Sequence, residues 1–112
     1  MNFYNVDGCV IYTTEKLGLE EIKVKLEDQG EKHVPVASLD GNVLLVKVGT
    51  NLHPMTLEHH IKFVLVETDK NVYVHNFNPT DEPVACFNLL EGEKAVAVYG
   101  YCNLHGVFKK EC

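Results

Sequence analysis

Ile61-Lys-Phe-Val-Leu-Val66 is followed by the polar segment Asp69-Lys-Asn71 and then by Val72-Tyr-Val-His-Asn-Phe77. Two runs rich in β-branched and aromatic residues on either side of a short polar segment indicate two strands joined by a turn. Similar runs occupy residues 34–37, 43–48, 84–89, 95–101 and 107–109. A set of about seven short strands at this spacing predicts an all-β protein in which two antiparallel sheets form a sandwich.

The size and charge of the chain narrow its class. Its 112 residues, of which 46% are apolar, suffice for one domain with a hydrophobic core. The formal net charge of -6 argues against a nucleic acid or an anionic membrane as a partner. No run approaches the roughly 20 apolar residues of a membrane span, and Met1-Asn-Phe-Tyr4 lacks the basic and apolar parts of a signal peptide. We therefore expect a cytoplasmic protein.

The four cysteines, at positions 9, 86, 102 and 112, include no Cys-x-x-Cys pair. Their irregular spacing does not resemble a disulfide framework, and in a reducing compartment they need not pair. Cys86 lies in the apolar run Val84-Ala-Cys-Phe87, which predicts a buried free thiol. Cys102 differs, because His105 follows it within one turn of the chain.

Histidines and one cysteine suggest a metal site. His53 and His59 lie in Asn51-Leu-His-Pro-Met-Thr-Leu-Glu-His-His-Ile-Lys62, where Pro54 favours a loop leading into a strand. Cys102 and His105 are close enough for one tight turn to present both to the same ion. Each pair alone is weak evidence for a metal site, but the two pairs together predict metal binding. Imidazole and thiolate suit iron, copper or zinc, and donor type does not choose among them.

Three sequence blocks resemble those of a known family. They are Glu31-Lys-His-Val-Pro35, then His53-Pro-Met55 with His59, then Cys102-Asn-Leu-His105-Gly106. The residue types in these blocks and the order of the blocks resemble those of the superoxide reductases, which include desulfoferrodoxin and neelaredoxin. The resemblance runs from about residue 29 to residue 109. It implies an immunoglobulin-like β-sandwich domain over residues 29–112, preceded by a short segment, residues 1–28.

The resemblance also implies a chemistry, the one-electron reduction of superoxide to hydrogen peroxide at a mononuclear non-haem iron. It implies that the iron ligands are His33, His53, His59 and His105 around the metal and Cys102 as the axial thiolate. Lys32 is expected to attract the anion and organise a proton-delivering water, and Glu31 to bind ferric iron after the product leaves. The expected partners are superoxide, an electron donor such as rubredoxin, and further copies of the chain in a homodimer or homotetramer.

Residues 1–28 resemble the remnant of a rubredoxin-like iron domain. Phe3-Tyr4 and Cys9 resemble a remnant of the first Cys-x-x-Cys motif of that domain, with Val6 at the position of its first cysteine, but the adjacent cysteine pair that completes such a site is absent. One thiol cannot hold a rubredoxin-type iron, so we expect no second iron centre. Residues 2–12 predict a strand, turn and strand, and the alternation from Glu21 to Leu26 predicts a half-buried strand.

Other interpretations remain open at this stage. His60 and His75 are predicted not to be ligands, and Asn103 is a candidate hydrogen-bond donor to the sulfur of Cys102. The protein as a whole could instead be a non-catalytic iron protein, such as a redox carrier or sensor, or a metal-free immunoglobulin-like interaction module. A cysteine hydrolase built on Cys102 and His105 is less supported, because the sequence shows no third orienting residue.

Overall fold

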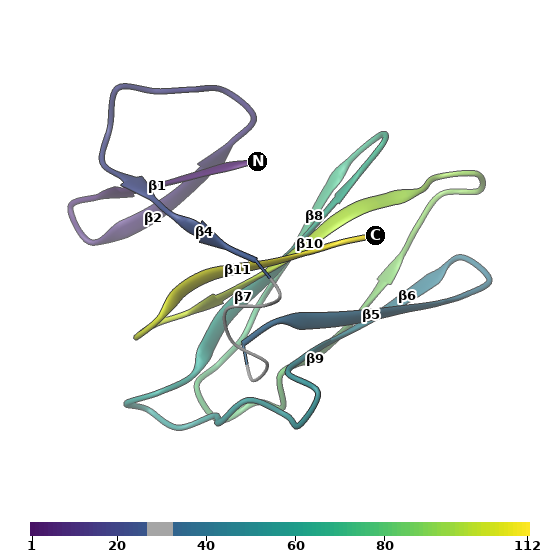
Figure 1. The fold of residues 1–112 in the computed structure, drawn as a ribbon. Helices are drawn as coiled ribbons and strands as arrows, with labels where there is room; N and C mark the ends of the chain where they lie inside the picture. Colours follow the sequence, from purple (N-terminus) through teal and green to yellow (C-terminus); the bar gives the residue numbers. More distant parts are fainter. Residues whose placement is uncertain (27–32) are drawn as a thin grey trace.

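The computed structural model describes residues 1–26 and 33–112. Two sheets face each other in an immunoglobulin-like sandwich (Figure 1). The larger sheet has the order β4 (Val24–Lys25), β11 (Gly106–Glu111), β10 (Ala95–Cys102), β7 (Ile61–Thr68), β8 (Val72–Asn76). The smaller sheet has the order β5 (Pro35–Asp40), β6 (Val43–Val48), β9 (Val84–Asn88). Strands β5 to β11 pair antiparallel within these sheets, so the predicted sandwich of about seven strands is confirmed.

The core between the sheets follows from alternation along the strands. Leu44, Val46 and Val48 on β6 are buried, and they belong to the same cluster as Val64 and Val66 on β7. Removing a side chain of this size from water stabilises the fold by about 1.5–3 kcal/mol. Alternation also explains a wrong prediction. Cys86 is exposed, because Ala85 and Phe87 on either side of it fill the inward positions of β9.

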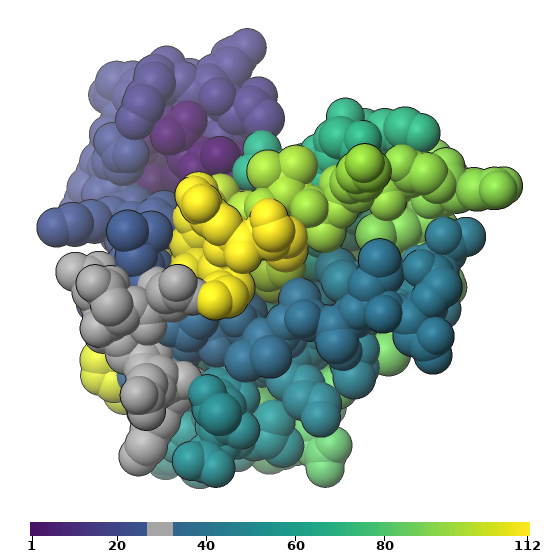
Figure 2. All heavy atoms as spheres, turned by 45° about the vertical axis from the view of Figure 1, so that its right-hand side comes forward, coloured from purple at the N-terminus to yellow at the C-terminus, as the bar shows by residue number. Residues whose placement is uncertain are grey.

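The N-terminal residues cover the outer face of the larger sheet. β1 (Asn2–Val6) and β2 (Cys9–Thr13) form a hairpin, and β3 (Glu21–Ile22) adds to β1. The ring of Phe3 lies 5.2 Å from that of Tyr99 and 6.3 Å from that of Phe63. Figure 2 shows these residues as a purple lobe beside the yellow C-terminal strand. This cover explains why β7 and β10 carry buried side chains on both faces.

Strand β4 departs from the antiparallel pattern. It pairs in parallel with β11, with Val24 opposite Val107 and Lys25 opposite Phe108. The N-terminal segment is therefore joined to the larger sheet by backbone pairing as well as by side-chain packing. The predicted division between residues 28 and 29 falls outside the described residues and stays a prediction.

One pair of strands sets the position of the functional end. β7 and β10 run side by side, with Ile61 opposite Cys102 at one end and Thr68 opposite Ala95 at the other. The chain enters β7 from the histidine loop and leaves β10 at Cys102, so these two segments meet at the same end of the sandwich. The described part of the chain contains no helix that is long and apolar enough to cross a membrane.

Candidate metal centre

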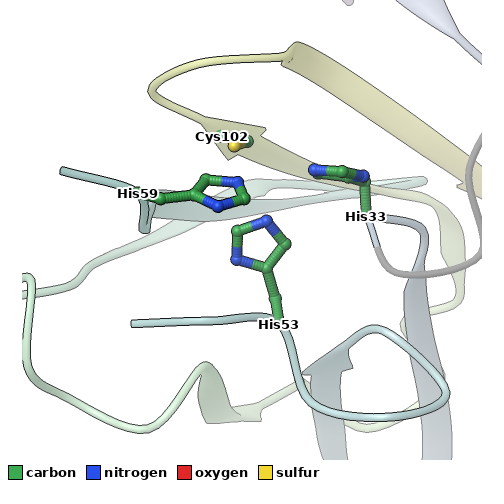
Figure 3. A group of neighbouring side chains, drawn as sticks. All are labelled: His33, His53, His59 and Cys102. Atoms are coloured by element: carbon green, nitrogen blue, oxygen red, sulfur yellow. The ribbon is translucent and has the colours of Figure 1, made fainter. Parts of the chain in front are cut away.

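Four separate segments bring histidine and cysteine side chains to this end of the sandwich. His33 lies just before β5, His53 and His59 lie in the loop between β6 and β7, and Cys102 is the last residue of β10. His105 lies in the tight turn that joins β10 to β11. Figure 3 shows the first three imidazoles and the Cys102 sulfur converging on one small volume. Rigid strands thus place residues that are far apart in sequence.

The distances define a compact donor group. The metal-binding atoms of His33, His53, His59 and Cys102 all lie within 4.8 Å of one another. His105 joins this group, because its Nδ1 lies 3.0 Å from Nε2 of His33 and 3.7 Å from Sγ of Cys102. Five nitrogen and sulfur donors therefore lie in one place, which is the arrangement expected of a metal centre.

The four imidazole rings form a closed square. Going around it, the ring centroids of His33 and His53 are 4.7 Å apart, and those of His53 and His59 are 4.5 Å apart. The separation of His59 from His105 is 5.1 Å, and that of His105 from His33 is 4.7 Å. His33 and His59 are farther apart, at 6.0 Å, because they lie across the square. The rings thus surround a common centre instead of stacking in a row.

Two buried nitrogen atoms at this centre are available to a ligand. Within the described part of the chain, Nε2 of His53 and Nε2 of His59 are buried and have no hydrogen-bond partner. Leaving such an atom unsatisfied costs about 1–3 kcal/mol. Nδ1 of His53 lies 2.7 Å from the carbonyl oxygen of Pro54. Since a carbonyl can only accept, Nδ1 carries the proton and Nε2 holds a free lone pair, which suits a metal ion.

The protonation of the histidines agrees with this role. Burial, followed by the neighbouring imidazoles and Lys25, lowers the pKa of His33 to about 4. Burial also lowers the pKa of His53, although its hydrogen bond to Pro54 acts in the opposite direction. The pKa of His59 is lowered first by burial and then by His105 and His60. These imidazoles are therefore neutral near pH 7, the form that binds metal.

A side-chain bracket connects the two loops of the centre. The side-chain oxygen of Asn103 accepts a hydrogen bond from the backbone N–H of His60 at 2.9 Å, and its amide donates to the carbonyl of Glu58 at 3.0 Å. These two bonds enclose His59 and tie its loop to the residue that follows Cys102. The side-chain amide of Asn103 thus donates to Glu58, and its backbone N–H donates to the carbonyl of His60 at 3.1 Å, so the predicted bond from Asn103 to the Cys102 sulfur is not among the hydrogen bonds of the described residues. Sequence reasoning missed this bracket.

The remaining predicted residues lie elsewhere. Glu31 and Lys32 fall outside the described residues. Nδ1 of His60 lies 2.9 Å from the carbonyl of Thr56, and His60 is not part of the donor group. His75 is on β8, where its ring contacts that of Phe77 at 4.7 Å. Phe108 is a neighbour of the centre, because its ring stacks on that of His33 with a centroid separation of 4.6 Å.

Fold and site together define a β-sandwich protein with a histidine and cysteine metal centre. The family model described as desulfoferrodoxin matches residues 25–111. A desulfoferrodoxin homolog of Archaeoglobus fulgidus is 40% identical over 79% of this chain and 70% of its own length. A superoxide reductase of Pyrococcus furiosus is 34% identical over 74% of this chain and 88% of its own. The chain belongs to the desulfoferrodoxin family.

Solved structures of superoxide reductases share this fold. The superoxide reductase of Treponema pallidum has a TM-score of 0.87 at 27% identity, covering 98% of this chain and 97% of that one. A one-iron superoxide reductase of Giardia intestinalis has a TM-score of 0.63 at 29% identity, covering 74% and 98%. By contrast, matches to six desulfoferrodoxins cover only 62% to 73% of their lengths.

Proposed function

We propose that this protein is a superoxide reductase, an oxidoreductase that reduces superoxide by one electron to hydrogen peroxide at a single mononuclear iron. The observation that carries the proposal is the pair of buried Nε2 atoms on His53 and His59, which have no hydrogen-bond partner among residues 1–26 and 33–112 and belong to a square of imidazoles beside a buried thiol. Relatives and structural neighbours named superoxide reductase support the same reaction.

The set of ligand atoms fits iron better than it fits a structural zinc ion. His33, His53, His59 and His105 would hold the ion around the square, and Cys102 would bind it as a thiolate from one side. Structural zinc sites are closed tetrahedra of four ligands, so five donors with a square of imidazoles do not match them. Four neutral imidazoles and one thiolate around ferrous iron leave a net charge of +1, which favours an incoming anion.

The residues of the chain create the surroundings for the reaction. Bound iron supplies the single electron. Cys102 is fully buried, which protects its sulfur from water and oxidants, whereas His105 is exposed and gives the centre a side open to solvent. The Cys102 thiolate adds electron density to the centre, and burial strengthens that effect. The product, hydrogen peroxide, needs one electron and two protons for each superoxide.

Lys32 and Glu31 are proposed to act in substrate attraction, proton delivery and binding of the ferric ion. Lys32 directly precedes His33 in the sequence, and Glu31 precedes Lys32. Lys32 attracts superoxide and holds a water that delivers a proton. Glu31 would be the residue that binds the ion in its ferric state. Local positive charge is needed for the first step because the whole chain carries a formal charge of -6.

The partners beyond superoxide belong to the proposal as well. An external one-electron donor such as rubredoxin reduces the iron again, and the chain assembles as a homodimer or homotetramer. Cytoplasmic location stays a prediction from the sequence. Chemical cross-linking and sedimentation would measure the assembly, and reduction of the ferric protein by purified rubredoxin would test the donor.

The first experiment is a measurement of iron content and of the optical spectrum in the oxidised and reduced states. We expect one iron per chain, a long-wavelength thiolate-to-ferric band that disappears on reduction, and stoichiometric consumption of superoxide by the reduced protein. Iron with a normal band but no superoxide consumption would support the redox carrier or sensor instead. Absence of iron and band after anaerobic reconstitution would support the metal-free interaction module.

A further inference from the structure

Lys25 is a cation at the centre that the sequence did not reveal. It lies on the short strand β4, and its Nζ donates a hydrogen bond of 2.8 Å to the carbonyl oxygen of His105. His105 is 80 residues away in sequence, and the two meet only because β4 pairs in parallel with β11. The backbone of a proposed iron ligand is thus held by a side chain from the N-terminal segment.

A second set of contacts leads from Lys25 to His33. The Nζ of Lys25 lies over the ring of Phe108, 5.1 Å from its centroid. The ring of His33 stacks on the same Phe108 ring, with 4.6 Å between the centroids and an angle of 18° between the planes. A cation over an aromatic face is attracted by the ring quadrupole. Lys25 therefore contacts, directly or through one ring, two adjacent members of the imidazole square.

The surroundings of Lys25 leave its charge available to the centre. Among the described residues, Lys16 and Lys109 pair with Glu21 and Glu111. Lys25 is half-buried, and its contacts in the same part of the chain are a carbonyl and an aromatic ring. The Nζ of Lys25 lies 2.8 Å from the backbone carbonyl of His105, and charges that act over less than about 8 Å at physiological ionic strength are screened by salt only in part.

We propose that Lys25 is a positioning residue of the iron centre, which fixes the backbone of His105 and adds a positive charge beside the imidazole square. The proposal rests on the proposed function. Positive charge stabilises ferrous over ferric iron, so Lys25 raises the midpoint potential, and it attracts the superoxide anion towards a molecule whose net charge would repel it. On this view β4, and with it the N-terminal segment, is part of the functional centre.

The test compares Lys25→Met, which keeps the apolar stem, with Lys25→Arg, which keeps the charge. Lys23→Met is the matched control, because Lys23 is exposed on the same segment and the change in net charge is identical. We expect Lys25→Met to retain iron and the thiolate band, to have a lower midpoint potential, and to react with superoxide about threefold more slowly at low salt. The rate should depend less on ionic strength, and Lys25→Arg should restore both properties.

The positioning role is measured separately in the iron-free protein. Amide hydrogen exchange in the turn of residues 103–106 should become faster in Lys25→Met and stay unchanged in Lys23→Met, since only the first loses the bond to His105. If Lys25→Met proves too unstable, Lys25→Gln replaces it. The proposal would be overturned if Lys25→Met and Lys23→Met had the same midpoint potential, the same dependence of the rate on ionic strength and the same amide hydrogen exchange. Failure of the wild-type protein to bind iron or consume superoxide would reject the proposed function first.

Discussion

The two ends of the paired strands β7 and β10 hold buried polar groups that differ in one respect. At the end near Cys102, Nε2 of His53 and Nε2 of His59 are buried without a partner within the described residues. At the other end, the buried carboxylate of Glu93 accepts a hydrogen bond from the hydroxyl of Thr68, and one from that of Tyr73 at 2.6 Å. The same scaffold therefore supports one saturated and one unsaturated cluster.

The Glu93 cluster is complete without any ligand. The backbone N–H of Leu90 donates to the carboxylate at 2.8 Å and the amide of Asn71 donates at 3.2 Å, in addition to the two hydroxyls. Burial by itself raises the pKa of Glu93, but these hydrogen bonds outweigh it and lower the pKa to about 2. The carboxylate joins the turn after β7 to the turn before β10, and its role is structural.

This difference in hydrogen bonding distinguishes a structural cluster from a ligand-binding one. A buried polar group that is fully hydrogen-bonded stabilises one conformation, whereas a buried nitrogen without a partner costs free energy that a ligand can recover. Both clusters contain buried polar atoms at an end of the same two strands. Hydrogen-bond saturation distinguishes them, so the predictions below remove the ligand site or the structural cluster in turn.

The largest expected effect is that of Cys102→Ser. A hydroxyl cannot replace the soft anionic thiolate, so we expect loss of the long-wavelength band of the ferric protein and a fall in superoxide reductase activity of roughly a hundredfold or more. Absorption spectroscopy and superoxide consumption measure the two effects. Cys86→Ser is the control, because that thiol is exposed on β9, and it should change neither. A Cys102→Ser protein with an intact band would contradict the axial assignment.

Removal of iron should destabilise the end near Cys102 and leave the Glu93 end unchanged. Binding to the folded state alone stabilises it by about 4 kcal/mol when free iron exceeds its dissociation constant a thousandfold. Thermal unfolding of the loaded and the chelated protein measures the difference. Hydrogen exchange should increase near residues 53–60 and 102–105 in the iron-free protein, and not around Thr68 and Leu90. Equal increases at both ends would show that the clusters are not independent.

A smaller effect is expected for Asn103→Ala, which removes both side-chain bonds of the bracket. The loop of His59 loses its tie to the turn after Cys102, so we expect about tenfold weaker iron binding and a loss of stability of about 1–3 kcal/mol. Competition with a chelator and thermal unfolding provide these values. Asn88→Ala, at an exposed position on β9, is the control. Iron affinity equal to that of the control would show that the bracket has no role in positioning His59.

Much of the fold could be predicted from the sequence because its strands carry their own signal. Runs such as residues 43–48 are rich in β-branched and other aliphatic side chains, and polar turns separate them. The two-residue strands β3 and β4 have no such signal, and the parallel pairing of β4 depends on tertiary contacts. Cys86 was predicted to be buried from the apolar run around it, but only the register of β9 decides which residues face inward.

For the centre, sequence motifs indicated residue types but could not indicate their surroundings. His33, His53, His59, Cys102 and His105 were proposed as ligands from three short blocks, and the structure brings these side chains together. Lys25 and Asn103 were missed or given another role, because their contacts cross between segments that are far apart in sequence. The position of a residue within a motif predicts which atom can bind the metal. Which other residues contact that ligand can be known only from the folded structure.

The smallest effect on activity is expected for Glu93→Gln, which alters the saturated cluster. Because the folded pKa of about 2 lies below the ordinary value of 4.5, ionised Glu93 stabilises the fold above pH 4.5, and this contribution is lost as the pH falls towards 2. Glutamine cannot ionise, and its amide group would face other donors. We expect a melting temperature lower by roughly 5 °C at pH 7, with the difference shrinking below pH 4.5.

Two controls make this last prediction specific to the cluster. Glu91→Gln changes the charge equally at an exposed position, so its melting temperature should follow that of the wild type at every pH. Iron content, the thiolate band and superoxide consumption of Glu93→Gln should all equal those of the wild type, since the cluster lies at the far end of β7 and β10. A loss of iron in Glu93→Gln would mean that the two ends are coupled through these strands, and saturation would then no longer separate structural from functional groups.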